Sequence, residues 1–239
     1  MKILDLTLPS PAENLACEEA LLDMAETAHG GQVLRFWESH SYFVVVGYAN
    51  KVATEVHRAA CDARRVPILR RCSGGGTVLQ GPGCLNYALI LKIADGGPLS
   101  TITSANKIIM ERNRSAMETL LQRPVHVSGH TDLSVDGLKF SGNSQRRRKH
   151  HLLFHGTILL NFKLGLVSEL LAMPSKQPDY RADRSHGEFI VNIGMDAESV
   201  KAALCRAWRA TSPLTVLPQS QIQRLVAERY DRDDWNFKF

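Results

Sequence analysis

Three consecutive glycines at residues 74–76 constrain the fold more than any other feature of this chain. Apolar, β-type stretches lie on both sides of them, at residues 66–69 and 85–91, so the glycines are expected to form a bend between strands. Main-chain N–H groups in such a bend can approach an anion closely. Arg70 and Arg71 precede it, and guanidinium groups suit carboxylate and phosphate oxygens. The stretch predicts an anion or nucleotide cradle, with a glycine-rich turn beside solvated arginines as the alternative.

Composition places the chain among ordinary globular proteins. It has 239 residues, 44% of them hydrophobic, and a net charge of +5, which is too mild for a dedicated nucleic-acid binder. Its five cysteines include no C-x-x-C pair, which favours a reducing compartment over a disulfide or zinc framework. Neither a secretory signal nor an apolar run of about 20 residues is present. We therefore expect a cytoplasmic protein with no membrane partner and no nucleic-acid partner.

Hydrophobic periodicity predicts a single α+β domain over residues 1–239, in which 212–239 is a short C-terminal extension. Its mixed, mainly antiparallel sheets are flanked by helices, because short β-type runs outnumber helical patterns and several are linked as hairpins. The expected strands are 3–8, 33–37, 42–47, 85–91, 133–135, 138–142 and 152–160. The expected helices are 14–25, 52–64, 100–121, 166–173 and 197–211.

A second group of polar residues surrounds the Asp136-Gly137 turn of a predicted hairpin. Asp132 stands where the first strand begins, a place that suits a metal-bound carboxylate or a turn cap. Lys139 alternates with Leu138 and Phe140 in the second strand, so it points to the opposite face from these two apolar side chains. It is either a charge clamp for an anion or a solvated residue of an edge strand.

Taken in order, the polar blocks resemble the lipoate–protein ligase family, within the wider superfamily of biotin and lipoate ligases and octanoyltransferases. The blocks are Arg-Arg-x-Ser-Gly-Gly-Gly-x-Val, Leu-Asn-Tyr, Gly-x-x-Asp-Leu, Gly-x-Lys-x-Ser-Gly-x-x-Gln and His-Gly-Thr-x-Leu-Leu. They occupy residues 70–78, 85–87, 129–133, 137–145 and 155–160. The resemblance covers residues 1 to about 210 and implies the fold of that family's catalytic domain.

The resemblance implies an ATP-dependent lipoate–protein ligase that forms lipoyl-AMP and passes the lipoyl group to a lysine of an acceptor domain or carrier protein. ATP, Mg²⁺ and lipoate would be substrates and ion, with no tightly bound prosthetic group. Lys139 would be catalytic, and Asp132 would help to position Mg²⁺. The residues implied to bind the nucleotide or lipoyl-AMP are Arg71, Ser73, Gly75, Gly76, Thr77, Val78, Leu79, Asn86, Lys139, Ser141, His155, Gly156 and Thr157. Trp37, Val44, Val46, Val78 and Leu89 are expected to wall a tunnel for the acyl chain.

Two other functions remain open. A lipoyl or octanoyl transferase of the same fold would use a cysteine nucleophile and no ATP. Residues 127–132 contain no cysteine, although Cys72 and Cys84 flank the glycine bend. A non-catalytic lipoyl-binding scaffold is the other possibility. Larger members of the ligase family carry a further C-terminal domain, so this chain is expected to use its short tail or a small accessory subunit instead.

Overall fold

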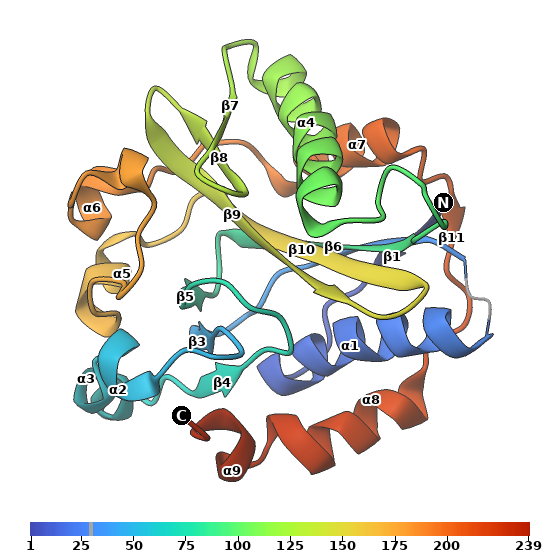
Figure 1. Ribbon diagram of the computed structural model, residues 1–239. Coiled ribbons are helices and arrows are strands. Elements are labelled where there is room, and N and C mark those ends of the chain that lie inside the picture. Colours follow the sequence, from blue (N-terminus) through green and yellow to red (C-terminus); the bar gives the residue numbers. More distant parts are fainter. Residues whose placement is uncertain (29–30) are drawn as a thin grey trace.

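The computed structural model describes residues 1–28 and 31–239, and its strands form two sheets. The large sheet has the order β11-β1-β2-β6-β10-β9-β8-β7, and the small one has the order β4-β3-β5 (Figure 1). Parallel pairs occur only at β1–β11, β1–β2 and β3–β4 among these strands, which confirms the mainly antiparallel α+β prediction. The strands are β1 (Lys2–Asp5), β2 (Val33–Trp37), β3 (Phe43–Val46), β4 (Ile68–Arg70), β5 (Val78–Gln80), β6 (Cys84–Lys92), β7 (His126–Ser128), β8 (Asp132–Val135), β9 (Leu138–Arg147), β10 (His151–Leu159) and β11 (Ser212–Pro213).

Helices cover both faces of the large sheet. In Figure 1, α4 and α7 lie on one side of it, and α1 and α8 lie on the other. The helices are α1 (Pro11–Ala28), α2 (Val52–Glu55), α3 (Arg58–Arg64), α4 (Ile102–Leu121), α5 (Gly165–Leu170), α6 (His186–Phe189), α7 (Ala197–Trp208), α8 (Gln219–Leu225) and α9 (Asp233–Asn236), with a 3₁₀ turn η1 (Asp179–Arg181) and a π-helical turn η2 (Val226–Tyr230). No helix among the described residues is long and apolar enough to cross a membrane.

Strand β10 shows how the sequence divides this sheet into faces. Phe154 and Ile158 point into the core beneath α4 and α7, because alternate residues of a strand face the same side. Leu153 packs on the opposite side, against the cluster beneath α1. His155 and Thr157 share that second side, where the helical cover leaves space and a cavity forms. The strand thus supplies a core face and a polar, ligand-accessible face.

The C-terminal segment is more structured than the sequence predicted. It contains α8, η2 and α9, whereas residues 212–239 carried no expected helix. Arg70 joins it to the small sheet: its guanidinium donates to the main-chain oxygens of Trp235 and Asn236, at 3.1 Å each. The main-chain N–H of Arg70 donates to Asn236 Oδ1, and Trp235 Nε1 donates to the Arg70 carbonyl. Arg70 is therefore a structural anchor for this segment.

Other predicted elements differ from the structure in their ends. The helix expected over 52–64 is broken between α2 and α3, at Val56, whose extended backbone forms a bridge to Leu171. The strand expected to end at residue 142 continues to Arg147 as β9, because it pairs with β10 through to Leu152. Arg146 and Arg147 thus lie in a strand, before the turn begins.

Candidate active site

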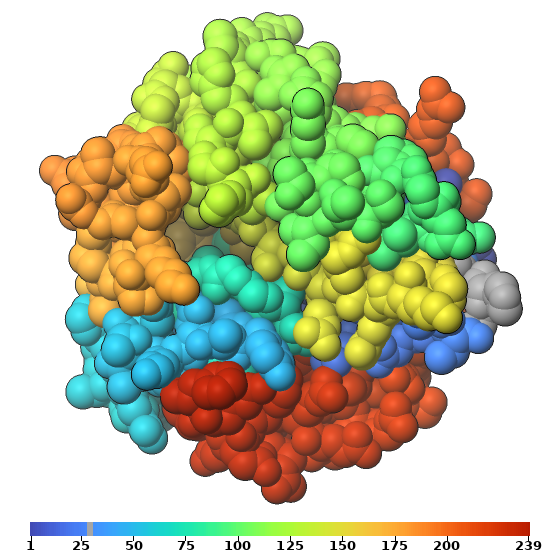
Figure 2. Space-filling model, in the orientation of Figure 1, coloured from blue at the N-terminus to red at the C-terminus, as the bar shows by residue number. Residues whose placement is uncertain are grey.

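A cavity of about 470 Å³ opens between the glycine loop, β9, β10 and the segment that contains η1 and α6. Figure 2 shows the corresponding hollow, bordered by the orange segment near residues 175–190 and by the blue and teal segments of the small sheet. The wall includes most of the residues that the sequence nominated. These are Arg71, Gly75, Gly76, Thr77, Val78, Leu79, Asn86, Asp132, Lys139, Ser141, His155, Gly156 and Thr157. Ser73 is nearby but lies behind this wall, with 1% of its surface exposed.

Arg71 organises the glycine loop from within. Its guanidinium donates to the carbonyl oxygens of Gly74 (2.6 Å) and Gly76 (2.7 Å). Burial lowers the pKa of Arg71 to about 10, so the group is still charged at neutral pH. The sequence suggested that this arginine would contact the ligand; in the structure most of its donors are used on the loop itself.

The consequence is a loop whose amides face outward. In a trans peptide the C=O of one residue and the N–H of the next point in opposite directions. Because Arg71 draws the Gly74 and Gly76 carbonyls inward, the N–H groups of Gly75 and Thr77 point away from it. Neither N–H donates a hydrogen bond within the described part of the chain. Gly75 has φ +86°, and a Cβ there would lie 2.9 Å from Arg71 Nη2, so the position needs glycine.

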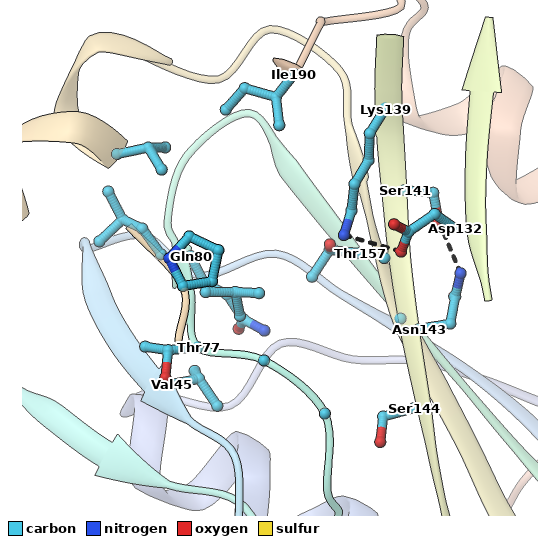
Figure 3. Close-up of a pocket in the computed structure, with 18 of the residues that line it drawn as sticks. Val45, Thr77, Gln80, Asp132, Lys139, Ser141, Asn143, Ser144, Thr157 and Ile190 are labelled. Carbon is cyan, nitrogen blue, oxygen red and sulfur yellow. Dashed lines mark hydrogen bonds and ion pairs between the residues drawn. The ribbon is translucent and has the colours of Figure 1, made fainter. Parts of the chain in front are cut away.

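Lys139 lies on the opposite wall. Its ammonium is 2.8 Å from Asp132 Oδ1, and its side chain is 25% exposed, toward the cavity (Figure 3). Asp132 Oδ2 accepts a hydrogen bond from Tyr180 Oη at 2.7 Å. Gly142 leaves room for the lysine, since a Cβ there would meet Lys139 Nζ at 2.8 Å. Lys139 is thus a held but accessible cation, not a solvated residue of an edge strand.

Asp132 does not form a ready metal site. Both of its oxygens already have partners, and no group of three His, Cys, Asp or Glu side chains suited to a metal occurs among residues 1–28 and 31–239. Mg²⁺ commonly enters proteins with substrate phosphates and needs only one or two carboxylates. The donor set fits an ion that arrives with a nucleotide better than a resident ion.

The apolar part of the cavity wall differs partly from the predicted tunnel. Trp37 and Val78 line it as expected, and Val45 does so in place of its neighbours. Val44 and Val46 instead pack in the core beneath α5, because strand alternation turns them to the other side of β3. Leu89 belongs to the core beneath α4 for the same reason on β6.

None of the five cysteines, all within the described residues, lines the cavity. Cys72 belongs to the core beneath α1, and Cys84 to the core beneath α5. Burial raises the pKa of both thiols to about 12, and that of Cys17 to about 11. Such thiols carry almost no thiolate at neutral pH, and the thiolate is the nucleophilic form.

Several wall residues were missed by sequence reasoning. Glu18 lies in α1, more than 130 positions from His155, yet its carboxylate reaches that imidazole. Gln80 is 6% exposed, and its Oε1 has no hydrogen-bond partner in the described chain. An unpartnered carboxamide in a cavity wall suits a ligand contact. Tyr180, which lies behind the wall in η1, donates to Asp132. Only the acid pair Glu18-Glu19, which stands between the apolar residues 15–17 and 20–22, gave a signal in the sequence.

A clamped glycine loop faces a held lysine across the cavity, an arrangement suited to binding an anion. A family model described as the lipoyl protein ligase A/B catalytic domain matches residues 10–208. The chain belongs to this family.

Named relatives include two kinds of enzyme. Octanoyltransferase LipM of Geobacillus kaustophilus is 25% identical, over 95% of this chain and 94% of that protein. Lipoate-protein ligase LplJ of Bacillus subtilis is also 25% identical, over 95% of this chain and 70% of that protein.

Solved structures share the fold. A lipoate-protein ligase A bound with ATP superposes with a TM-score of 0.85 at 21% identity, covering 99% of this chain and 98% of that one. A bi-partite lipoate protein ligase from Thermoplasma acidophilum, studied with its E2 lipoyl domain, gives 0.84 at 22% identity, covering 99% and 95%. These likenesses confirm the predicted fold class of a lipoate ligase catalytic domain.

Proposed function

We propose that this chain is an ATP-dependent lipoate–protein ligase that forms lipoyl-AMP and transfers the lipoyl group to a lysine of an acceptor protein. The observation that carries the proposal is the accessible ammonium of Lys139 in a cavity whose described wall contains no cysteine. An enzyme of this fold without a nucleophilic thiol needs another way to activate the acyl group, and adenylation supplies one.

The shape of the cavity supports a ligand with two parts. One side of its wall is apolar through Leu15, Trp37 and Val45, which belong to the core beneath α1. Another side is apolar through Phe162, Val167 and Leu171, from the separate core beneath α5. Lys139, Thr157 and the glycine loop are among the polar groups of the same wall. An acyl-adenylate likewise has apolar material on both sides of a charged junction: the acyl chain and the adenine ring.

The proposed reaction has two steps, and the polar residues of the wall stabilise the charge that develops in it. In the first step a lipoate carboxylate oxygen attacks the α-phosphorus of ATP, and pyrophosphate leaves. Negative charge concentrates at this junction, where a fixed ammonium and the outward N–H groups of Gly75 and Thr77 stabilise it. In the second step the acceptor amine attacks the acyl carbon, AMP leaves, and a proton is released. Mg²⁺, when bound with ATP, would neutralise phosphate charge beside Asp132.

The acceptor is proposed to be a lipoyl-acceptor domain or carrier protein. The bi-partite archaeal ligase with the same fold was studied with its E2 lipoyl domain. A small accessory subunit that completes adenylation is a further proposal for this chain.

The alternative is an octanoyltransferase, which is favoured by the LipM relatives that match nearly their whole length. ATP dependence separates the two. The purified chain is incubated with an apo lipoyl domain and either lipoate, with or without ATP and Mg²⁺, or an octanoyl thioester of acyl carrier protein. We expect acylation of the domain, detected by intact mass, only from lipoate with ATP. Acylation from the thioester without nucleotide would overturn the proposal in favour of the transferase.

A further inference from the structure

A continuous chain of buried polar contacts runs from helix α1 to the glycine loop. Glu18 Oε2 lies 2.5 Å from His155 Nδ1, and His155 Nε2 lies 2.6 Å from Ser73 Oγ. Arg71 Nε donates to the same Ser73 oxygen at 3.0 Å. All four side chains are at least nine-tenths buried, with exposed fractions of 3% for Glu18 and 9% for His155.

Glu18 is ionised despite its burial. Burial opposes ionisation, but its contacts with His155, Arg35 and Trp37 outweigh this and lower the pKa of the carboxyl below its usual value. Trp37 Nε1 donates to Oε1 at 2.8 Å, and the Arg35 guanidinium lies 3.9 Å away. A carboxylate can only accept, so the close contact requires a proton on His155 Nδ1.

The direction of the remaining contacts follows from that proton. A neutral imidazole with Nδ1–H leaves Nε2 as an acceptor, so the Ser73 hydroxyl donates to it. The Ser73 oxygen is then free to accept from Arg71 Nε. With that tautomer both imidazole nitrogens have a partner, Glu18 at Nδ1 and Ser73 at Nε2.

We propose that Glu18 is a positioning residue for the glycine loop, acting through His155 and Ser73 on Arg71. By fixing the imidazole, the carboxylate fixes the hydroxyl that accepts from Arg71 Nε, and Arg71 in turn holds the Gly74 and Gly76 carbonyls, so that the N–H groups of Gly75 and Thr77 point away from its guanidinium. The loop therefore presents its N–H groups before any ligand arrives. The purpose of this role rests on the proposed adenylate chemistry. The contacts from Glu18 to Arg71, in contrast, are present in the protein without a ligand.

Glu19 supplies a matched control. It is adjacent in the sequence, equally buried at 2% exposure, and also accepts hydrogen bonds. Its partners are Tyr230 Oη, at 2.8 Å, and Arg229, both in η2 of the C-terminal segment. Substitution of Glu19 thus removes a buried carboxylate from the same helix without touching the contacts to the glycine loop.

The experiment uses the full chain and two readouts. ¹⁵N NMR of the free protein gives the His155 tautomer, and calorimetry gives the affinity for lipoyl-sulfamoyl-adenosine, a non-hydrolysable mimic of lipoyl-AMP. We expect Nδ1–H in the wild type and in Glu18→Gln, whose amide oxygen can still accept from Nδ1; because its NH₂ then faces the Trp37 Nε1–H donor, Glu18→Gln should lose some affinity, but less than Glu18→Leu. Glu18→Leu should shift the proton to Nε2 and weaken the analogue about tenfold. Glu19→Gln and Glu19→Leu should match the wild type in both readouts.

Ser73→Ala keeps the test decisive if Glu18→Leu does not fold. It should weaken the analogue about tenfold while His155 retains Nδ1–H. An Nε2–H tautomer in the wild type would overturn the proposal, as would wild-type affinity in the folded Glu18→Leu and Ser73→Ala variants. An equal loss in Glu19→Leu would show a general packing effect and would also overturn it. If the wild type binds no analogue, the proposed function fails, while the tautomers of the wild type and the Glu18 variants still decide the contacts.

Discussion

The glycine loop and the β8–β9 hairpin face each other across the cavity, yet they use their cations differently. In the loop, Arg71 is 8% exposed, and its guanidinium donates hydrogen bonds to the loop carbonyls. In the hairpin, the Lys139 side chain is 25% exposed and has one carboxylate partner. Both residues looked like anion clamps in the sequence. The comparison shows that one cation shapes a binding surface made of main-chain N–H groups, while the other is itself available to the ligand.

The largest effect should come from Lys139→Ala. We expect lipoylation of the acceptor to fall at least about 100-fold, or about 2.7 kcal/mol of barrier, because the charge at the acyl–phosphate junction loses its counterion. The free energy of unfolding should change by about 1 kcal/mol or less, since the lost ion pair is partly exposed. The mass of the acceptor domain measures lipoylation, and unfolding in urea measures the free energy of unfolding. Activity within about tenfold of the wild type would remove Lys139 from its assigned role.

Arg71→Lys should give a smaller loss of activity and a larger loss of stability. An ammonium lacks the planar fork that reaches two carbonyls and a hydroxyl at once. We expect about a tenfold loss of lipoylation and about 1–3 kcal/mol of unfolding free energy, from buried acceptors left without donors. If stability and activity both stay unchanged, Arg71 does not hold the loop.

Arg70→Lys tests the neighbouring arginine, whose guanidinium contacts the C-terminal segment and not the glycine loop. It should lower the free energy of unfolding by about 1–3 kcal/mol, because its bonds to the carbonyls of Trp235 and Asn236 are lost. At temperatures below the unfolding transition, the lipoylation activity should stay within about threefold of the wild type. Limited proteolysis should cut residues 212–239 earlier than in the wild type. A tenfold loss of activity with unchanged proteolysis would show that Arg70 serves the site directly.

How far the sequence could predict this site depends on the range of each contact. The Asp136-Gly137 turn and the alternation of Lys139 with Leu138 and Phe140 are local, so the hairpin and the lysine's face were predictable. Glu18 meets His155, and Arg70 meets Asn236, across 137 and 166 positions. No local pattern encodes such pairings; they follow from how α1 packs on the large sheet and α9 on the small one. Hence residue type alone did not separate Arg70 from Arg71, and only the resemblance nominated Arg71; in the structure Arg70 contacts the C-terminal segment and Arg71 the glycine loop.

The smallest effects are expected at the cysteines. With a pKa of about 12, Cys72 and Cys84 carry roughly one thiolate in ten thousand at pH 8. Both thiols should therefore react with iodoacetamide much more slowly in the folded protein than in urea. Cys72→Ser and Cys84→Ser should each keep lipoylation within about threefold. An acyl thioester on either cysteine, seen by mass spectrometry without ATP, would point to the transferase.

The central claim, that the cavity activates the acyl group as an adenylate held by Lys139, is tested most directly by single-turnover transfer from supplied lipoyl-AMP. The folded chain is mixed with lipoyl-AMP and an apo lipoyl domain, and the mass of the domain is followed over time. This bypasses ATP activation, so a missing accessory subunit does not obscure the result. We predict lipoylation of the acceptor lysine by the wild type and by Cys72→Ser, and none above background by Lys139→Ala. Failure of the folded wild type to transfer from lipoyl-AMP to a competent acceptor would contradict the account.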